Sequence, residues 1–160
     1  LYLDFDGCLH CDEVYASPER GVYVERGELF EHAPKLVAIL ERFPSVQLIL
    51  STSWVGHLGF AETRARLPPV LQSRVVGATY HDVRRHIWGH QTRFQQITAD
   101  AQRRQLTRWI ALDDDVEGWP PHQRHRLVAP NPDIGLQAPD IERLTMLLAD
   151  LTSQPPVGDE

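Results

Sequence analysis

Three short apolar segments of this chain each end in polar, reactive side chains. The first is Tyr2 to Phe5, which carries Asp4 and is followed by Asp6. The second is Val46 to Leu50, followed by Ser51-Thr52-Ser53. The third is Trp109 to Leu112, followed by Asp113-Asp114-Asp115. A continuous apolar run such as Val46 to Leu50 is typical of a buried parallel strand. In open parallel sheets, ligands bind beyond the carboxyl ends of the strands. We therefore expect these side chains to meet at one edge of one sheet.

Helices are predicted between these strands and after the last of them. They are Ala33 to Phe43, Phe60 to Leu67, Thr92 to Thr107 and Asp140 to Leu151. Further strands are predicted at Arg74 to Ala78 and Arg126 to Ala129, and a small hairpin around Val22 to Val24. Strands that alternate with helices indicate a parallel sheet with right-handed crossovers. The predicted fold class is α/β, a Rossmann-like three-layer sandwich with a central parallel sheet.

The length and composition fit one globular domain. A chain of 160 residues suits a single α/β domain, which we assign to residues 1–151, followed by a polar tail, 152–160, that frays. The net charge of −6 argues against binding nucleic acid by bulk charge, and no apolar run is long enough to span a bilayer. Because the chain opens on Leu1 without an initiator Met, we expect an upstream segment or partner domain.

The cysteines and four of the eight histidines are interpreted without a metal. A structural zinc site needs four ligands, and Cys8 and Cys11 have no second C-x-x-C to complete one. We interpret them as reduced thiols in a cytosolic loop, which predicts a cytoplasmic protein. Four other histidines lack further ligands at a suitable spacing and are predicted to be surface residues: His86, His90, His122 and His125.

Asp4 and Asp6 lie two residues apart at the end of the first strand, where Gly7 turns the chain. Side chains at positions i and i+2 of a strand point the same way, so both carboxylates can face one pocket. Paired carboxylates repel unless a cation lies between them or one is protonated, and a hard ion such as Mg²⁺ removes the conflict. One carboxylate can then attack phosphorus, and the other can give a proton to the leaving oxygen.

The run Asp4 to Leu9 resembles the D-x-D-G-x-L/V signature of the phosphotransferase branch of the haloacid dehalogenase (HAD) superfamily. The resemblance implies that Asp4 is the nucleophile that becomes an aspartyl-phosphate. It also implies that Asp6 is the general acid and base, with its backbone carbonyl as a metal ligand. The implied cofactor is Mg²⁺, and the implied activity is hydrolysis of a phosphate ester.

The end of the predicted strand Val46 to Leu50 resembles the second motif of that superfamily, in which a Ser or Thr hydroxyl binds a phosphoryl oxygen. Ser51 is our choice because Leu50 is the last apolar residue of the strand. Thr52 and Ser53 stay open as alternatives, because a slip of one residue changes which side chain faces inward.

The acidic run Asp113-Asp114-Asp115 resembles the fourth motif of the superfamily. The resemblance implies that Asp113 is a direct Mg²⁺ ligand and that Asp114 is a ligand or orients bound water. The third motif is a Lys or Arg that offsets the charge between nucleophile and phosphate. Arg93 is our choice because it precedes the long helix leading to the acidic strand, and Arg103 and Arg104 are the alternatives.

A finer resemblance, over most of the chain from Leu1 to about Leu151, is to the HAD domains of Swiss Army Knife RNA repair proteins. The matching segments are Asp4 to His10, Ser51 to Trp54, Arg93, Leu112 to Asp115 and Gly135-Leu136. One departure is Val55-Gly56 after Trp54, where the resemblance leads us to expect Arg. This departure bears on how far the substrate of that group carries over.

The segment between Asp6 and Ala33 is long enough for a flap but not for a cap domain, so we expect an open site. Open sites suit a phosphate on a macromolecule, such as an RNA end or a phosphoprotein. Candidates to line the opening are Arg84, Arg85 and His86, with Trp88 as a stacking surface. The alternative interpretation is a solvated charged loop and a Trp in the core.

The sequence thus predicts a Mg²⁺-dependent phosphate-ester hydrolase. A different class remains as the alternative, a catalytically weak HAD-fold module that binds or regulates within a larger RNA-repair-type assembly. A response-regulator receiver is disfavoured, because its phosphoacceptor sits alone on a later strand and not in an Asp-x-Asp-Gly run on the first.

Overall fold

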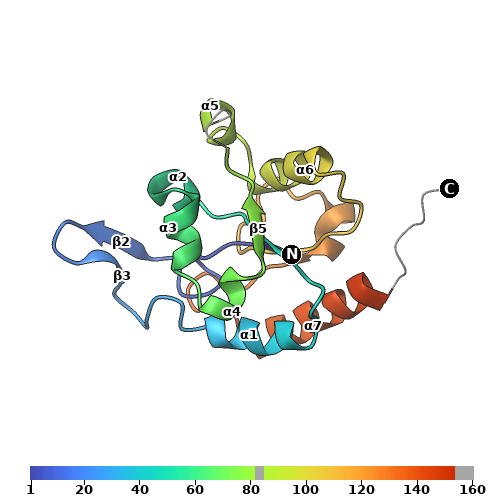
Figure 1. Cartoon of the computed structure of the whole chain (residues 1–160), viewed down its shortest axis with the longest axis horizontal. Coiled ribbons are helices and arrows are strands. Elements are labelled where there is room, and N and C mark those ends of the chain that lie inside the picture. Colours follow the sequence, from blue (N-terminus) through green and yellow to red (C-terminus); the bar gives the residue numbers. More distant parts are fainter. Residues whose placement is uncertain (82–84, 154–160) are drawn as a thin grey trace.

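A computed structural model of the chain describes residues 1–81 and 85–153, and a five-stranded sheet lies at its centre (Figure 1). The strand order is β5-β4-β1-β6-β7, and each neighbouring pair is parallel. The strands are β1 (Tyr2–Leu3), β4 (Leu48–Leu50), β5 (Val75–Ala78), β6 (Ala111–Leu112) and β7 (Leu127–Val128). The strand order reverses at β1, and such a switch point is where ligands bind in open α/β sheets.

Strands β1, β4 and β6 end at the same level. Leu3 pairs with Leu50 on one side and with Leu112 on the other. The backbone bonds continue one residue further: the Asp4 N–H donates to the Leu112 carbonyl at 3.0 Å, and the Ser51 N–H donates to the Leu3 carbonyl at 2.8 Å. The side chains that follow the three strands therefore emerge together, as the sequence predicted.

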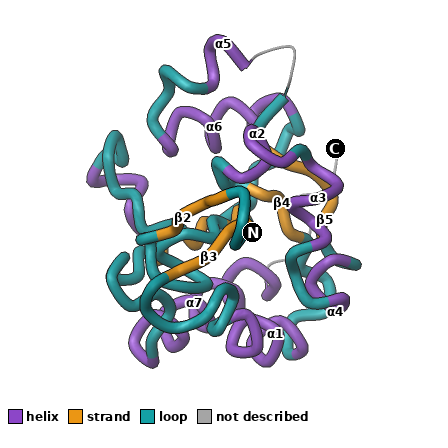
Figure 2. The backbone as a smooth tube through the Cα atoms, turned by 90° about the vertical axis from the view of Figure 1, so that its left-hand side faces the viewer, coloured by secondary structure: helices purple, strands orange, loops and turns teal. Residues whose placement is uncertain are grey.

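Helices cover both faces of the sheet, which gives the predicted three-layer sandwich (Figures 1 and 2). Alternate strand residues face opposite sides. One set packs with helices α1 (Ala33–Glu41) and α7 (Ala138–Ser153), and its members are Leu3, Leu50 and Leu112 with Leu36, Leu40, Leu144 and Leu148. The other set packs with helix α6 (Arg93–Arg103), and its members are Tyr2, Ile49 and Ala111 with Ile97 and Ala101.

An antiparallel hairpin of β2 (Val14–Ser17) and β3 (Gly21–Val24) projects from the body of the domain (Figure 1). It lies between β1 and α1 in the chain, so the predicted small flap is confirmed. The other described helices are short: α2 (Trp54–Leu58), α3 (Phe60–Ala65), α4 (Pro69–Gln72), α5 (Arg85–Trp88) and the 3₁₀ helix η2 (Pro121–Arg126). Among the described residues, no helix combines the length and apolarity needed to cross a membrane.

Several element bounds differ from the sequence predictions. Helix α4, which the sequence did not predict, begins at Pro69, because proline suits the first turn of a helix. Helix α6 ends at Arg103, not Thr107, and Gln105 has a φ of 57°, a left-handed conformation that a helix cannot contain. Helix α7 runs on through Ser153 and includes the first residues of the predicted tail, while 154–160 lie outside the described residues.

Candidate active site

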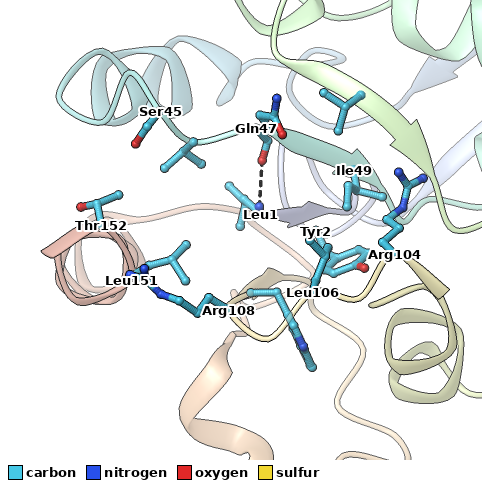
Figure 3. Close-up of a pocket in the computed structure, with 13 residues that line it drawn as sticks. Leu1, Tyr2, Ser45, Gln47, Ile49, Arg104, Leu106, Arg108, Leu151 and Thr152 are labelled. Carbon is cyan, nitrogen blue, oxygen red and sulfur yellow. Dashed lines mark hydrogen bonds between the residues drawn. The ribbon is translucent and has the colours of Figure 1, made fainter. Parts of the chain in front are cut away.

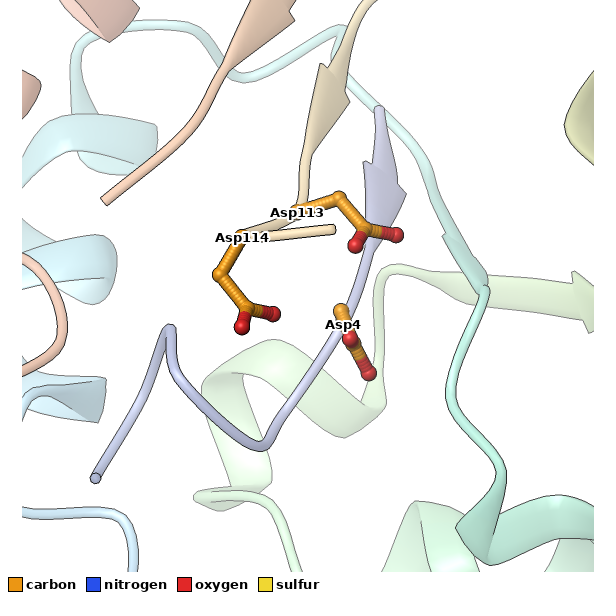
Figure 4. Close-up of side chains that lie close together, drawn as sticks. All are labelled: Asp4, Asp113 and Asp114. Carbon is orange, nitrogen blue, oxygen red and sulfur yellow. The ribbon is translucent and has the colours of Figure 1, made fainter. Parts of the chain in front are cut away.

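Three carboxylates from distant parts of the chain meet at the carboxyl edge of the sheet (Figure 4). One carboxylate oxygen from each of Asp4, Asp113 and Asp114 lies within 4.8 Å of the other two. Asp4 and Asp113 are buried, at 4% and 0% exposure. This group, the carboxylate cluster, joins the end of β1 to the end of β6.

The carboxylate cluster offers only oxygen donors, which hard divalent cations such as Mg²⁺ prefer. The buried Oδ2 of Asp113 has no hydrogen-bond partner among the described residues, although fully buried carboxylate oxygens are normally paired. Three carboxylates at this spacing, one with a buried oxygen that accepts no hydrogen bond from a described residue, fit a hard divalent cation.

The electrostatics of the carboxylate cluster favour bound positive charge. Burial raises the pKa of Asp4, which Arg93 lowers and Asp6 raises further. Burial and then the charge of Asp4 raise the pKa of Asp113 well above its ordinary range. The same two causes, in that order, raise the pKa of Asp114 from 3.8 to about 7. A cation beside these groups would favour their ionised forms.

Arg93 is the basic residue that the structure places against the carboxylate cluster. Its Nη2 lies 3.2 Å from Asp4 Oδ2, and its Nε lies 2.9 Å from Asp113 Oδ2 in an ion pair that is not a hydrogen bond. Arg93 is the first residue of α6, which a capping box formed by Thr92 and Gln95 starts at this point. The cap therefore fixes Arg93 at the helix start, from which its guanidinium reaches Asp4.

The two alternatives to Arg93 lie elsewhere. Arg103 and Arg104 pair with the buried carboxylate of Asp100, near the far end of the same helix. Asp100 also accepts a hydrogen bond of 2.9 Å from the Tyr2 hydroxyl. These arginines therefore neutralise a structural carboxylate and do not contact the cluster.

Asp6 lies beside the cluster, and its carboxylate is not part of it. Its side chain is 30% exposed. The indole Nε1 of Trp54 donates to Asp6 Oδ1 at 2.8 Å, and His10 Nε2 lies 3.0 Å from the same oxygen. His10 and Trp54 lie within the sequence motifs, but the motifs assign them no role. The spacing of four residues from Asp6 to His10 was the available signal.

The three hydroxyls considered for phosphate binding have different surroundings. Ser51 is fully buried, and its Oγ has no partner among the described residues. A hydrogen bond from the Thr52 side chain lowers the pKa of Asp4, and Thr52 Oγ1 accepts from the Trp54 N–H at 3.3 Å. Ser53 lines a cavity on each side of the site. All three residues lie at the predicted strand end, and Ser51 has an unused buried donor.

Gly7 makes room for Asp114. Its φ is 69°, and a Cβ added there would lie 2.4 Å from the Asp114 carboxyl carbon. A non-glycine residue would therefore be strained by its backbone conformation and would displace a cluster carboxylate.

We expect Gly7→Ala to weaken Mg²⁺ binding by at least tenfold, because Asp114 must move away from Asp4 and Asp113. Isothermal titration with Mg²⁺ measures this loss. The matched control is Gly21→Ala: Gly21 has a φ of 67°, but nothing lies within 4 Å of an added Cβ. Equal Mg²⁺ affinity in the two variants would show that Gly7 contributes only backbone conformation.

Cavities flank the site on two sides. A cavity of about 360 Å³ separates the hairpin from α2 and is lined by Asp6, Val14, Tyr15, Ala16, Val22, Ser53, Trp54, His57 and Leu58. A second cavity of about 360 Å³ lies on the Arg93 side and is lined by Ser53, Trp88, Gly89, His90, Gln91, Thr92, Arg93, Gln96, Asp115 and Glu117. The described residues thus leave openings on both flanks of the site.

A larger cavity of about 760 Å³ lies away from the carboxylate cluster (Figure 3). It includes Leu1, Tyr2 and Gln47 at the start of β1 and β4, with Arg104 and Leu151. None of its described lining residues carries a carboxylate. It therefore cannot supply the acid and metal chemistry of the other edge.

The residues predicted to line the opening are only partly described. Arg84 and the side chain of Arg85 lie outside the described residues. His86 is exposed. Trp88 is half-buried, lines the cavity on the Arg93 side, and donates from Nε1 to Thr79 Oγ1 at 3.4 Å.

The remaining predicted surface and thiol residues lie as expected. His86, His90, His122 and His125 are exposed. Cys8 and Cys11 are free and buried, and burial followed by the neighbouring carboxylates raises the pKa of Cys8 well above that of an ordinary thiol. Cys8 therefore lacks the low pKa of a reactive cysteine. The buried Sγ of Cys11 donates to the Arg26 carbonyl at 3.4 Å.

The parallel sheet, the acidic strand ends and the short flap define a HAD-like α/β domain. Residues 1–141 match the family described as the HAD domain in Swiss Army Knife RNA repair proteins, and the chain belongs to that family. Comparisons with curated proteins and with solved structures found no match. Membership supports a phosphatase-like hydrolase at the level of the superfamily, which agrees with the resemblance seen in the sequence.

Proposed function

We propose that this domain is a Mg²⁺-dependent phosphate-ester hydrolase that acts through an aspartyl-phosphate on Asp4. The carboxylate cluster carries the proposal, because three acids gathered with an arginine at the switch point of the sheet are costly for the fold alone. Asp4, Asp113 and Asp114 would hold the metal. When bound, Mg²⁺ supplies positive charge that neutralises phosphate oxygens and orients the phosphate.

The residues of the chain provide the remaining parts of the reaction. An Asp4 oxygen attacks phosphorus, while the Arg93 guanidinium at 3.2 Å offsets negative charge between carboxylate and phosphate. Asp6 gives a proton to the leaving oxygen as the ester bond breaks. Asp6 then accepts a proton from the water that attacks the aspartyl-phosphate, which frees Asp4 and releases phosphate.

We propose a phosphate on a macromolecule as the substrate. Support comes from the two flanking cavities and from a flap of only one hairpin, which leave the site accessible to a large molecule. The family description refers to RNA repair proteins, which makes an RNA end the first substrate to test and a phosphoprotein the second. We place the protein in the cytoplasm because both cysteines are free.

The alternative proposal is a binding or regulatory module that retains the fold. Its support is the contact of Arg93 with both Asp4 and Asp113, which already offsets part of the negative charge of the carboxylate cluster. A module of this kind would bind a phosphorylated partner through Arg93 without turnover.

A substrate screen separates the two proposals. We expect release of phosphate from 4-nitrophenyl phosphate and from one or more of three physiological classes, which are nucleotides, RNA ends and phosphopeptides. Activity should require Mg²⁺ and vanish in EDTA. Beryllium fluoride with Mg²⁺ should bind to Asp4 as a mimic of the phosphorylated state. Binding of beryllium fluoride without any turnover would favour the module. A protein that shows no binding and no turnover would contradict both proposals.

A further inference from the structure

We infer that His10 and Trp54 are positioning residues that hold the general acid, Asp6, for proton transfer. The inference rests on the proposed hydrolase function. Its basis is the convergence of two nitrogen donors from different elements on one oxygen of Asp6. Trp54 Nε1 comes from the first residue of α2, at 2.8 Å, and His10 Nε2 comes from the loop after β1, at 3.0 Å.

The protonation of His10 is set by its other nitrogen. Nδ1 accepts a hydrogen bond of 3.1 Å from the backbone N–H of Phe30, so Nδ1 carries no proton. The ring proton is therefore on Nε2, which donates to Asp6 Oδ1. His10 is fully buried, and its orientation is fixed at both nitrogens.

Phe30 supports this arrangement at a conformational cost. Its φ is 61°, in the left-handed region that non-glycine residues rarely occupy. Its ring packs edge-on against Phe5, His10 and Trp54, with centroid distances of 5.1, 5.0 and 5.5 Å. A rare backbone conformation held by such packing is typical of a functional site, and here it delivers the N–H that sets the tautomer of His10.

Anchoring Oδ1 leaves Oδ2 as the oxygen that exchanges the proton. During transfer the bond from Asp4 to phosphorus forms, the ester bond breaks, and the proton on Asp6 Oδ2 passes to the leaving oxygen. The proton returns to Oδ2 from water in the second step. Asp6 also lines the cavity between the hairpin and α2, which is where the leaving group would lie.

A positioned acid matters most when the leaving group needs its proton. We therefore expect Trp54→Phe to lower kcat/KM for a simple alkyl phosphate by a factor at least about tenfold larger than the factor for 4-nitrophenyl phosphate. Across a series of substituted phenyl phosphates, kcat/KM should depend more steeply on the pKa of the leaving phenol in the variant than in the parent.

The chain offers a matched control in Trp119→Phe. Trp119 is also buried, at 3% exposure, but its Nε1 has no hydrogen-bond partner among the described residues. This variant loses the same ring volume without losing a donor to Asp6, and the leaving-group dependence of kcat/KM should not change.

His10 provides the second test if Trp54→Phe fails to fold. His10→Phe should steepen the leaving-group dependence, and His10→Gln should restore part of it, because the glutamine amide can replace the Nε2 donor. An equal loss of kcat/KM for every leaving group in these variants would overturn the positioning role while leaving the hydrolase intact. Absence of turnover in the parent protein would instead remove the proposed function itself.

Discussion

Asp4→Asn will lower the turnover of 4-nitrophenyl phosphate by about ten-thousand-fold or more and leave the domain folded. Asparagine has nearly the same shape but cannot form the aspartyl-phosphate. The fold should tolerate the change because Asp4 is a buried acid next to Asp113 and Asp6, so the substitution removes repulsion as well as the ion pair with Arg93. Phosphate release measures the activity, and circular dichroism with thermal unfolding measures the fold.

The control for this substitution is Asp133→Asn, which makes the same chemical change at an exposed position away from the cluster. It should retain full activity. Beryllium fluoride binding should be lost in Asp4→Asn and kept in Asp133→Asn. Undiminished turnover in the Asp4 variant would show that another residue is the nucleophile.

The position of the carboxylate cluster was predictable from the sequence because it depends on strand ends alone. Asp4 and Asp113 follow apolar strand residues that pair in register, so their meeting needs only that the strands be parallel neighbours. The contact of Arg93 was predictable for a related reason. Thr92 and Gln95 form a capping box, which fixes the helix start and so the place of Arg93.

The partners of Asp6 were not predictable in this way. They depend on the path of the loop after β1 and on the short helix α2, which no periodic pattern marks. The tautomer of His10 depends on Phe30, a residue far along the chain in a rare backbone conformation. Such tertiary contacts leave no local signal in a single sequence.

The same limit applies to the choice of hydroxyl at the end of β4. Strand pairing places Ser51 level with Asp4, but the backbone turns into α2 directly afterwards, so the alternation of side chains no longer holds at Thr52. The sequence defined the three candidates, and their different contacts arise from that turn.

The domain in EDTA will lose stability as the pH rises from about 5 to about 8, and Mg²⁺ will restore it. The folded domain raises the pKa of Asp114 from 3.8 to about 7. Between these two pH values the folded state therefore binds more protons than the unfolded state, and stability falls with rising pH. The raised pKa values of Asp4 and Asp113 act in the same direction.

The pKa change of Asp114 extends from 3.8 to about 7, and the part of it above pH 5 corresponds to about 3 kcal/mol. Partial exposure and solvent screening reduce this to roughly 1.5 kcal/mol. For a domain of this size that is a fall in Tm of roughly 3–6 °C. Because Mg²⁺ binds ionised carboxylates, the rise in Tm on adding Mg²⁺ should be small at pH 5 and largest at pH 8. Thermal unfolding with Mg²⁺ and with EDTA across this pH range measures both effects.

Asp114→Asn isolates the contribution of the cluster from all other titrating groups. In EDTA its Tm should fall less between pH 5 and pH 8 than that of the parent, because the variant lacks one carboxyl group with a raised pKa. In Mg²⁺ it should gain less stability at pH 8, because a ligand is gone. If the variant and the parent had the same pH dependence in EDTA and the same response to Mg²⁺, Asp114 would neither titrate in this range nor bind the ion, and the metal site would have to be assigned to other residues.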